Sequence, residues 1–530
     1  ARMTPAAHDV LLVNGNVLPM DGTTEPRAVA FHNGRIAYVG DSNTVRKGAA
    51  PGARVIDLAG RTVIPAFTDA HAHVWKMGHL LSTMLDVRRA ASIDALVETV
   101  ATRDKELPPE QWLLGRGFNE IAIAEKRKPA RHDLDRAAPS RPVVLTRACG
   151  HIYAANSVAL RRAAIDATTP APPGGVIEYD EHGEPNGLLH ETAMGLINRV
   201  MPQPSASDYE LMIQAALRHQ LSLGITASSD CGVTPELLDV YRDMDARGAL
   251  PARVNVMPLR RVDGRRDPVP LPAQHVSDML RVNTVKFVAD GGLSGATAAL
   301  SVPYRHANTT GTLRFEKQEL LRLCQESQDK GWRIASHAIG DVAIDMVLSR
   351  YERLGPHPKR LAHRIEHFGL PSSEQLRRAA RLGVIAVPQS IFLYELGGNF
   401  LEMLPESLFP RTYPIRAMLD AGLTVALSSD APVVEDDNPL RGIYAAVTRR
   451  TNVGETILPE QAITAQEALY AYTMGGAIAS GDECNRGSLT PGKWADVAVL
   501  SADPLAAEPE ALAEIRVEMT FLAGNIAYER

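Results

Sequence analysis

The stretch Val63-Ile-Pro-Ala-Phe-Thr-Asp-Ala-His-Ala-His73 joins an apolar, strand-like run to two closely spaced histidines. In a β-strand, residues i and i+2 point to the same face, so His71 and His73 project together from the end of this strand. Two adjacent imidazoles are an economical way to bind a divalent metal ion. Since an H-x-H pair alone is common, the rest of the chain has to decide between a metal site and ordinary packing.

Seven further apolar runs follow, most of them separated by amphipathic stretches such as residues 317–331. They read LGITASSD, ARVNVMPL, TVKFVADG, WRIASHAIG, RLAHRIEHFG, GVIAVPQS and GLTVALSSDAP. Eight strand–helix units predict an α/β fold built on a closed parallel (β/α)8 TIM barrel. The active site of such a barrel lies where its strands end.

Polar residues stand at the ends of three of these later strands. His337 ends the fifth strand, His367 the sixth and Asp430 the eighth. One histidine in an apolar strand is more often a hydrogen-bonded core residue than a ligand, and we interpret His363, which lies deeper in its strand, in that way. Four histidines and one aspartate at the strand ends of one barrel instead predict a metal centre.

Lys286 lies inside the apolar run TVKFVADG, where a buried ammonium group is costly unless it is paired or chemically altered. Strand parity places it on the same face as Asp290. Two interpretations stay open: an ion pair with Asp290, or carboxylation of the lysine by CO₂, which creates an anionic bridge between two metal ions.

Both ends of the chain carry short strands broken at glycine turns, and neither end has enough strands for a stable sheet alone. We therefore expect residues 1–65 and 481–530 to form one composite β-sandwich domain around a barrel of residues 66–480. Residues 105–205, rich in Pro, Arg and Gly, predict an inserted subdomain after the first barrel strand. This agrees with about three domains for a chain of 530 residues.

The composition is that of a globular protein, with 45% hydrophobic and 22% charged residues and a net charge of −6. It offers no basic run for nucleic acid and no apolar run long enough to span a membrane. The four cysteines form no C-x-x-C pair, which argues against a disulfide scaffold and favours a reducing, cytoplasmic location. We see no signal peptide, although removal of one before the first residue stays open.

Taken together, these motifs resemble the amidohydrolase superfamily, specifically amidohydrolase family 3, which includes N-substituted formamide deformylase-like enzymes. Besides the opening stretch and the last segment, GSLTPGKWADVAVLSADP, the similarity rests on RHDLDRAAPSRPVVLTRACGH at 131–151, VKFVADGGLSGATAALSVPY at 285–304, ASHAIGD, RIEHFG and SSDAPV. Three positions depart from the family pattern: Cys149 replaces the Asp of Asp-Gly-His, Ala296 replaces an arginine, and Ala66 replaces a glycine.

The resemblance implies two divalent metal ions per subunit, zinc before other metals, with one ion as the alternative. It assigns His71 and His73 to the more buried metal and His337 and His367 to the more exposed one. Lys286, N6-carboxylated, bridges the two ions in this scheme, and Asp430 completes the ligand set.

The implied reaction is hydrolysis of a C–N bond in an N-formyl or N-acyl amine by a metal-activated hydroxide, with Asp430 as proton shuttle. His151 is the expected contact for the carbonyl oxygen. The expected substrate contacts are Trp75, Tyr153, Phe392 and Tyr394. We expect a small-molecule substrate, no nucleic-acid or membrane partner, and leave a homodimer open.

Three alternatives remain. A mononuclear aminohydrolase that deaminates a heterocycle has no use for Lys286. A lactone or carbamate hydrolase fits the same ligands. A non-catalytic regulatory homologue is disfavoured, because a relaxed site is expected to lose at least one ligand.

Overall fold

The computed structural model describes residues 7–530, so residues 1–6 of the expected terminal domain lie outside the described residues. Each of the eight apolar runs contains a strand, and the α/β class is confirmed. The strands are β7 (Phe67–Ala72), β14 (Ile225–Val233), β15 (Arg253–Pro258), β18 (Thr284–Val288), β19 (Arg333–Ala338), β20 (Arg364–His367), β21 (Ile385–Val387) and β22 (Thr424–Val425).

These strands pair in parallel and in chain order within two five-stranded sheets. One sheet runs β7-β14-β15 and continues into β17 (Leu280–Val282) and β16 (His275–Val276); the other runs β18-β19-β20-β21-β22. A parallel bridge between Leu259 and Lys286 joins the two sheets. The outer strands of the two sheets, β7 and β22, also lie near each other. Asp430 follows β22, and its amide donates to the carbonyl oxygen of His71 on β7 over 2.7 Å.

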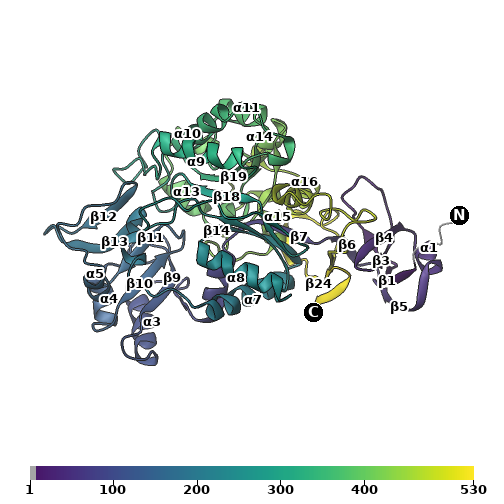
Figure 1. Ribbon diagram of the computed structural model, residues 1–530, viewed down its shortest axis with the longest axis horizontal. Coiled ribbons are helices and arrows are strands. Elements are labelled where there is room, and N and C mark those ends of the chain that lie inside the picture. Colours follow the sequence, from purple (N-terminus) through teal and green to yellow (C-terminus); the bar gives the residue numbers. More distant parts are fainter. Residues whose placement is uncertain (1–6) are drawn as a thin grey trace.

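Amphipathic helices cover these strands and bury a continuous apolar core against them (Figure 1). The helices are α2 (Val74–Ser82), α7 (Ala206–Ser222), α8 (Pro235–Ala246), α9 (Lys317–Asp329), α10 (Asp341–Arg353), α11 (Ser373–Arg381), α14 (Ile415–Asp420), α15 (Pro439–Thr448), α16 (Ala465–Tyr472) and α17 (Met474–Ser480). Their starts are fixed locally: Ser372 caps α11 by accepting from the amide of Gln375 over 3.1 Å. Two short helices, α12 (Ile391–Glu395) and α13 (Gly397–Met403), follow β21.

A separate six-stranded sheet lies between β7 and β14 in the sequence and to one side of the parallel strands in space (Figure 1). In spatial order it contains β12 (Gly175–Tyr179), β13 (Pro185–Glu191), β11 (Ile152–Ala155), β10 (Val143–Arg147), β9 (Leu113–Phe118) and β8 (Leu85–Asp86). The accompanying helices are α3 (Ile93–Glu106), α4 (Arg131–Ala137), α5 (Ser157–Arg162) and α6 (Gly195–Asn198). The sheet therefore begins before residue 105.

Strands from the two ends of the chain share a sheet. It runs β2 (Asn16–Val17), β6 (Thr62–Pro65), β23 (Val497–Leu500), β24 (Val517–Leu522) and β25 (Asn525–Glu529). A second sheet holds β4 (Arg35–Gly40), β3 (Ala28–His32), β1 (His8–Val13) and β5 (Ala49–Asp57) beside the short α1 (Ser42–Lys47). One apolar cluster joins the sheets, in which the rings of Phe31 and Phe521 lie 5.4 Å apart. Only Ala66 separates β6 from β7, so the terminal sheet leads directly into the strand that carries His71.

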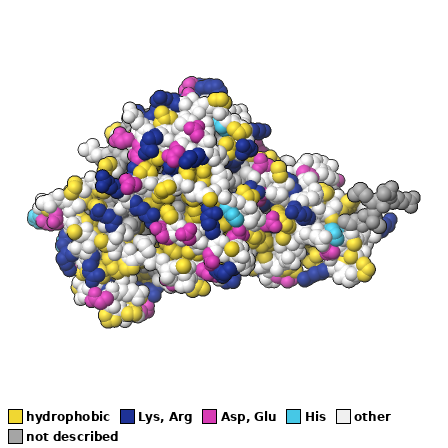
Figure 2. Space-filling model, in the orientation of Figure 1, with side chains coloured by type: hydrophobic (Ala, Val, Ile, Leu, Met, Phe, Trp, Pro, Cys, Tyr) yellow, Lys and Arg dark blue, Asp and Glu magenta, His cyan; other side chains and the backbone are white. Residues whose placement is uncertain are grey.

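On the face shown in Figure 2, basic and acidic side chains are interspersed. Within residues 7–530, no helix combines the length and the apolar character needed to cross a membrane.

Candidate metal centre

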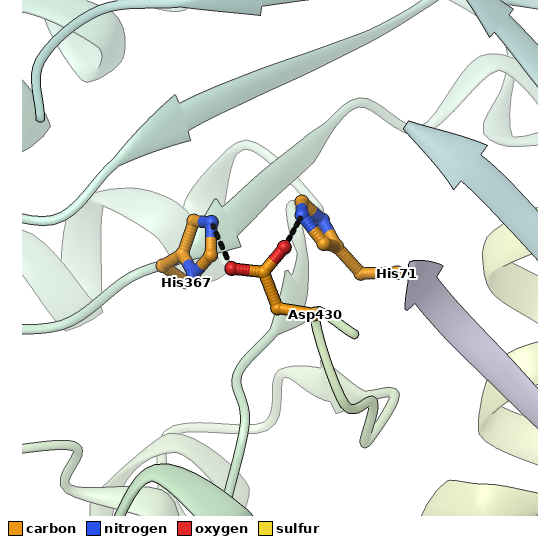
Figure 3. Close-up of side chains that lie close together, drawn as sticks. All are labelled: His71, His367 and Asp430. Atoms are coloured by element: carbon orange, nitrogen blue, oxygen red, sulfur yellow. Dashed lines mark ion pairs between the residues drawn. The ribbon is translucent and has the colours of Figure 1, made fainter. Parts of the chain in front are cut away.

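Four of the expected ligands converge where the parallel strands end. Nε2 of His71 and Nε2 of His73 lie 3.0 and 3.1 Å from the same atom, Oδ1 of Asp430. Nε2 of His367 lies 3.9 Å from Oδ2 of Asp430. Figure 3 shows the Asp430 carboxylate between the rings of His71 and His367. Residues from β7, β20 and the segment after β22 thus form one cluster.

The remaining histidines continue the cluster outward. The rings of His337 and His367 have centroids 4.5 Å apart, and the ring of His151 lies 5.1 Å from that of His337. His337, His367 and Asp430 line a cavity of about 170 Å³, whereas His71 lies behind them, fully buried. His73 and Lys286 line the same cavity, so all the expected ligands except His71 are exposed to it.

Two features show that the residues fit a divalent metal ion. Nε2 of His71 and Oδ1 of Asp430 are buried and have no hydrogen-bond partner. Their separation of 3.0 Å is near the roughly 3.3 Å between ligands of a tetrahedral zinc ion with bonds of about 2.0–2.1 Å. The ligand atoms of His71, His367 and Asp430 all lie within 4.8 Å of one another.

The electrostatics of the cluster also suit a cation. Burial lowers the pKa values of His73, His337 and His367 well below normal, which favours the neutral imidazole that binds metals. Burial raises the pKa of Asp430, but His71 and His367 lower it more, so its pKa lies well below the usual range. The group is therefore a carboxylate. Burial lowers the pKa of His71, but Cys231 and Asp430 raise it more, to well above normal, so His71 differs from the three neutral imidazoles.

Surrounding side chains hold the ligands in place. Nδ1 of His71 lies 3.0 Å from Oε1 of Glu366, and both groups are fully buried. Arg364 donates to both oxygens of Glu366, over 2.6 and 3.0 Å. Nδ1 of His367 pairs with Oε1 of Gln389 over 2.6 Å. Such partners fix the tautomer and the direction of a metal-binding imidazole.

His367 and Asp430 also share an uncommon backbone conformation, with φ of 71° and 60°. A non-glycine residue in this left-handed region costs about 1–2 kcal/mol, which the surrounding structure has to offset. Asp69 contributes to this by accepting from the amide and the hydroxyl of Ser429, over 3.0 and 2.5 Å. The turn that presents Asp430 is therefore anchored to β7.

Lys286 enters the same cavity from β18 and is 2% exposed. Among the described residues it forms no ion pair with Asp290, which was one of its two expected roles. Asp290 instead accepts from the amides of Ala299, Ile339 and Gly340. His363 behaves as a core residue: its Nδ1 accepts from the amide of Ile334 over 3.0 Å, and its Nε2 lies 2.7 Å from Oε1 of Gln328.

His151 reaches the cavity from the inserted sheet. Its Nδ1 lies 2.9 Å from Oε2 of Glu191, which also accepts from Arg314 over 2.8 Å. Burial raises the pKa of Glu191, but His151 and Arg314 lower it more, to about 2. This carboxylate therefore fixes Nδ1 of His151 as a donor and leaves Nε2 for the cavity.

The expected substrate contacts separate into three groups. Tyr153 lines the cavity and donates to Oδ1 of Asn198 over 2.8 Å. Phe392 stacks on His367 with ring centroids 5.9 Å apart, and Trp75 lines an adjoining cavity. Tyr394 is not in the cavity: its ring packs against Tyr444 and beneath Arg441. Phe392 and Tyr394 lie on α12, where residues two apart face different sides of the helix.

Several side chains at the site were not singled out by the sequence analysis. They are Glu366, Gln389, Glu191, Asp69 and Arg116. A signal exists for one of them: Arg364 and Glu366 are a charged i, i+2 pair on one face of an apolar strand, next to His367. The partners of the others lie far away in sequence.

Histidines and one aspartate at the carboxyl ends of parallel strands, around a cavity, are typical of metal-dependent hydrolases. Within that class, the chain belongs to the amidohydrolase family, whose sequence profile matches residues 54–528. The family expected from the motifs is therefore confirmed, and the chain is a hydrolase of carbon–nitrogen bonds other than peptide bonds.

Known relatives cover nearly the whole chain. It is 33% identical to the N-substituted formamide deformylase of Arthrobacter pascens, over 98% of both chains. It is 32% identical to the putative amidohydrolase YtcJ of Bacillus subtilis, over 95% of this chain and 96% of that one. A metal-dependent hydrolase from Pyrococcus horikoshii has a similar structure, with a TM-score of 0.75, 26% identity and coverage of 94% and 99%.

Proposed function

We propose that this protein is a metal-dependent amidohydrolase that cleaves the C–N bond of a small N-formyl or N-acyl amine. The observation that carries the proposal is the convergence of His71, His73 and His367 on the Asp430 carboxylate, with buried polar atoms that lack protein partners. The deformylase relative supports an amide-type substrate.

His71, His73 and Asp430 would hold one divalent ion and His337 and His367 a second, and Lys286, if carboxylated, would supply a further anionic ligand. The burial of Lys286 in the cavity without an ion pair to Asp290 supports this role. Zinc is the first candidate, because imidazole and carboxylate are common zinc ligands. When bound, such an ion supplies Lewis acidity and lowers the pKa of water.

The protein's own residues would manage the substrate and the protons. His151, oriented by Glu191, donates from Nε2 to the carbonyl oxygen as negative charge develops there. Asp430 accepts the proton of the attacking water and delivers it to the departing nitrogen. The ring of Phe392 stacks on the ring of His367, and Tyr153 and Trp75 contact the substituent of the substrate.

We further infer that the eight parallel strands close into a (β/α)8 barrel over residues 66–480, which the Leu259–Lys286 bridge and the Asp430–His71 hydrogen bond support. Residues 1–65 and 481–530 would form a β-sandwich, supported by their shared apolar cluster. Residues 105–205 belong to the proposed insertion. Four free cysteines agree with a cytoplasmic location.

A substrate screen tests the proposed reaction. The metal-replete protein is expected to release formate or a carboxylic acid, with the amine, from N-formyl or N-acyl amines. Asp430→Asn should lower this rate at least about 100-fold, because general acid–base catalysis contributes roughly 10²–10⁴-fold. Undiminished hydrolysis in Asp430→Asn would rule out the proton transfer. Release of ammonia from heterocycles alone, with a single bound metal ion, would favour the deaminase.

A further inference from the structure

Two cationic side chains line the cavity without an acidic partner. Arg116 on β9 is 4% exposed, and its Nε is buried with no hydrogen-bond partner. Its guanidinium makes one long contact, 3.4 Å from NH2 to the carbonyl oxygen of Ala148. Lys76 on α2 lines the same cavity. Neither forms an ion pair with any residue that the structure describes.

The other arginines of this cavity are neutralised. Arg314 pairs with Glu191 and Asp263, and Arg261 pairs with Glu319. The nearby Asp230 pairs with neither Arg116 nor Lys76; it accepts from the hydroxyl of Tyr241 over 2.5 Å. Burial lowers the pKa of Arg116, and the Asp430 carboxylate of the same cavity raises it without forming an ion pair with it. A buried guanidinium without an ion-pair partner is costly, so Arg116 favours the binding of a further anion.

The two cations stand where two cavities adjoin. The second cavity, of about 90 Å³, shares Lys76, Arg116, Gly150 and Tyr153 with the first. The rest of its wall is mainly apolar and includes Trp75, Met84, Leu114, Val144, Met201 and Pro202. An anion held at this junction would lie between the histidines and an apolar chamber.

The turn before His151 is fitted closely to Arg116. Gly150 has φ of 80°, and a Cβ atom at this position would lie 3.0 Å from NH2 of Arg116. The guanidinium therefore stands directly beside the turn that presents His151. Burial, and then the charge of Arg116, lower the pKa of Lys76 to about 8, so the two positive groups act on each other.

We infer that Arg116 and Lys76 form a carboxylate subsite and that the substrate is an amide bearing a carboxylate and an apolar substituent. A guanidinium and an ammonium group bind a carboxylate through charge-assisted hydrogen bonds. The apolar substituent enters the second cavity while the amide lies beside His151 and Asp430. The amide part of this inference rests on the proposed function, whereas the anion site does not.

The kinetic test compares N-formylphenylalanine, as both enantiomers, with N-formyl-2-phenylethylamine, which lacks only the carboxylate. The wild-type protein should show kcat/KM at least about 10-fold higher for the carboxylate compound. Arg116→Met should remove this preference by lowering kcat/KM for the carboxylate compound more than for the neutral compound. Lys76→Met, at a less buried position, should weaken the preference in the same direction.

Arg88→Met is the matched control. Arg88 lies next to Gly117, the residue that follows Arg116, and so carries a positive charge in the same region. It is paired with Asp86 over 2.8 Å and lines neither cavity. The preference should survive in this variant, which separates a contact with the substrate from a general loss of positive charge. Equal preference in the wild-type protein and in both Arg116→Met and Lys76→Met would overturn the inference.

A binding measurement separates the anion site from the reaction. Phenylacetate should raise the thermal unfolding temperature of the wild-type protein more than phenylacetamide does, and this difference should vanish in Arg116→Met. If this result is obtained while no amide is hydrolysed, the proposed function fails and the anion site stands. If phenylacetate acts equally on the wild-type protein and Arg116→Met, the anion site is rejected, whatever the activity.

Discussion

Glu366 lies directly behind His71: its Oε1 is 3.0 Å from Nδ1 of the histidine, and both side chains are fully buried. The histidine therefore has one nitrogen on Glu366 and the other, Nε2, near Asp430. Burial raises the pKa of Glu366, but Arg364 and His71 lower it more, so the group is a carboxylate. Its negative charge strengthens His71 as a ligand.

Replacing Glu366 by Gln should therefore lower metal affinity by about 10–100-fold, the usual effect of removing such a partner. The measurement is metal content after dialysis against a graded series of chelator concentrations. Asp496→Asn provides the control, because Asp496 forms a buried pair with Arg253 over 2.7 Å but contacts no proposed ligand. Equal metal loss in both variants would point to general destabilisation.

Glu191 should matter through His151. In Glu191→Gln the Nδ1 proton of His151 loses its anionic acceptor, so Nε2 is no longer held as the cavity-facing group. We expect kcat to fall by about 10²-fold, comparable to the loss of an oxyanion donor, while metal content stays unchanged. His151→Gln should show a similar loss, and the double variant should add little. If the losses of kcat in the two single variants add fully in the double variant, Glu191 does not act through His151.

The two aromatic residues of α12 give opposite expectations. Phe392→Ala removes the ring stacked on His367, and the resulting misplacement of the histidine should lower kcat/KM by about 10–100-fold. Tyr394→Ala should change kcat/KM by less than about twofold, because its ring contacts Tyr444 and Arg441 instead. Steady-state kinetics on the same substrate decide between them, and a large loss in Tyr394→Ala alone would contradict the geometry.

Acid stability should depend on Glu120. Burial raises its pKa, but Arg147 and Lys128 lower it more, to about 2. Because the folded-state pKa is depressed below about 4.5, the ion pair stabilises the protein above that pH, and the stabilisation is lost as pH falls towards 2. The shift corresponds to about 3 kcal/mol at most.

The comparison of wild-type protein with Glu120→Gln checks this. The free-energy difference between them, measured from denaturant unfolding, should shrink as pH is lowered from 5 to 3, since only the wild-type protein has this carboxylate to protonate. A difference independent of pH over that range would show that the ion pair does not set the pKa of Glu120.

Much of the site was predictable because it follows strand parity. His71 and His73 are an i, i+2 pair, and the runs ending in His337, His367 and Asp430 are buried on both faces, as parallel strands between helices must be. The partners Glu366 and Glu191 were not predictable, because each contacts a histidine from a distant segment. Phe392 and Tyr394 were both expected to contact the substrate, whereas helix α12 directs their side chains to different sides.

The sequence predicted that a segment is inserted after the first barrel strand, but not that this segment forms a six-stranded sheet. Its strands are two to seven residues long, and their pairing order departs from the order in the sequence. The expectation that the two chain ends belong together rested on the shortage of strands at each end, and β2 and β6 share a sheet with β23, β24 and β25.

The pairing of β6 with β23 has a consequence for how the protein is made. β6 leads through Ala66 into β7, yet its partner β23 is synthesised more than four hundred residues later. During translation, the strand that carries His71 is thus tethered to an unfinished sheet until β23, β24 and β25 emerge from the ribosome. The sheet that leads into β7 is therefore complete only when these last strands have been synthesised.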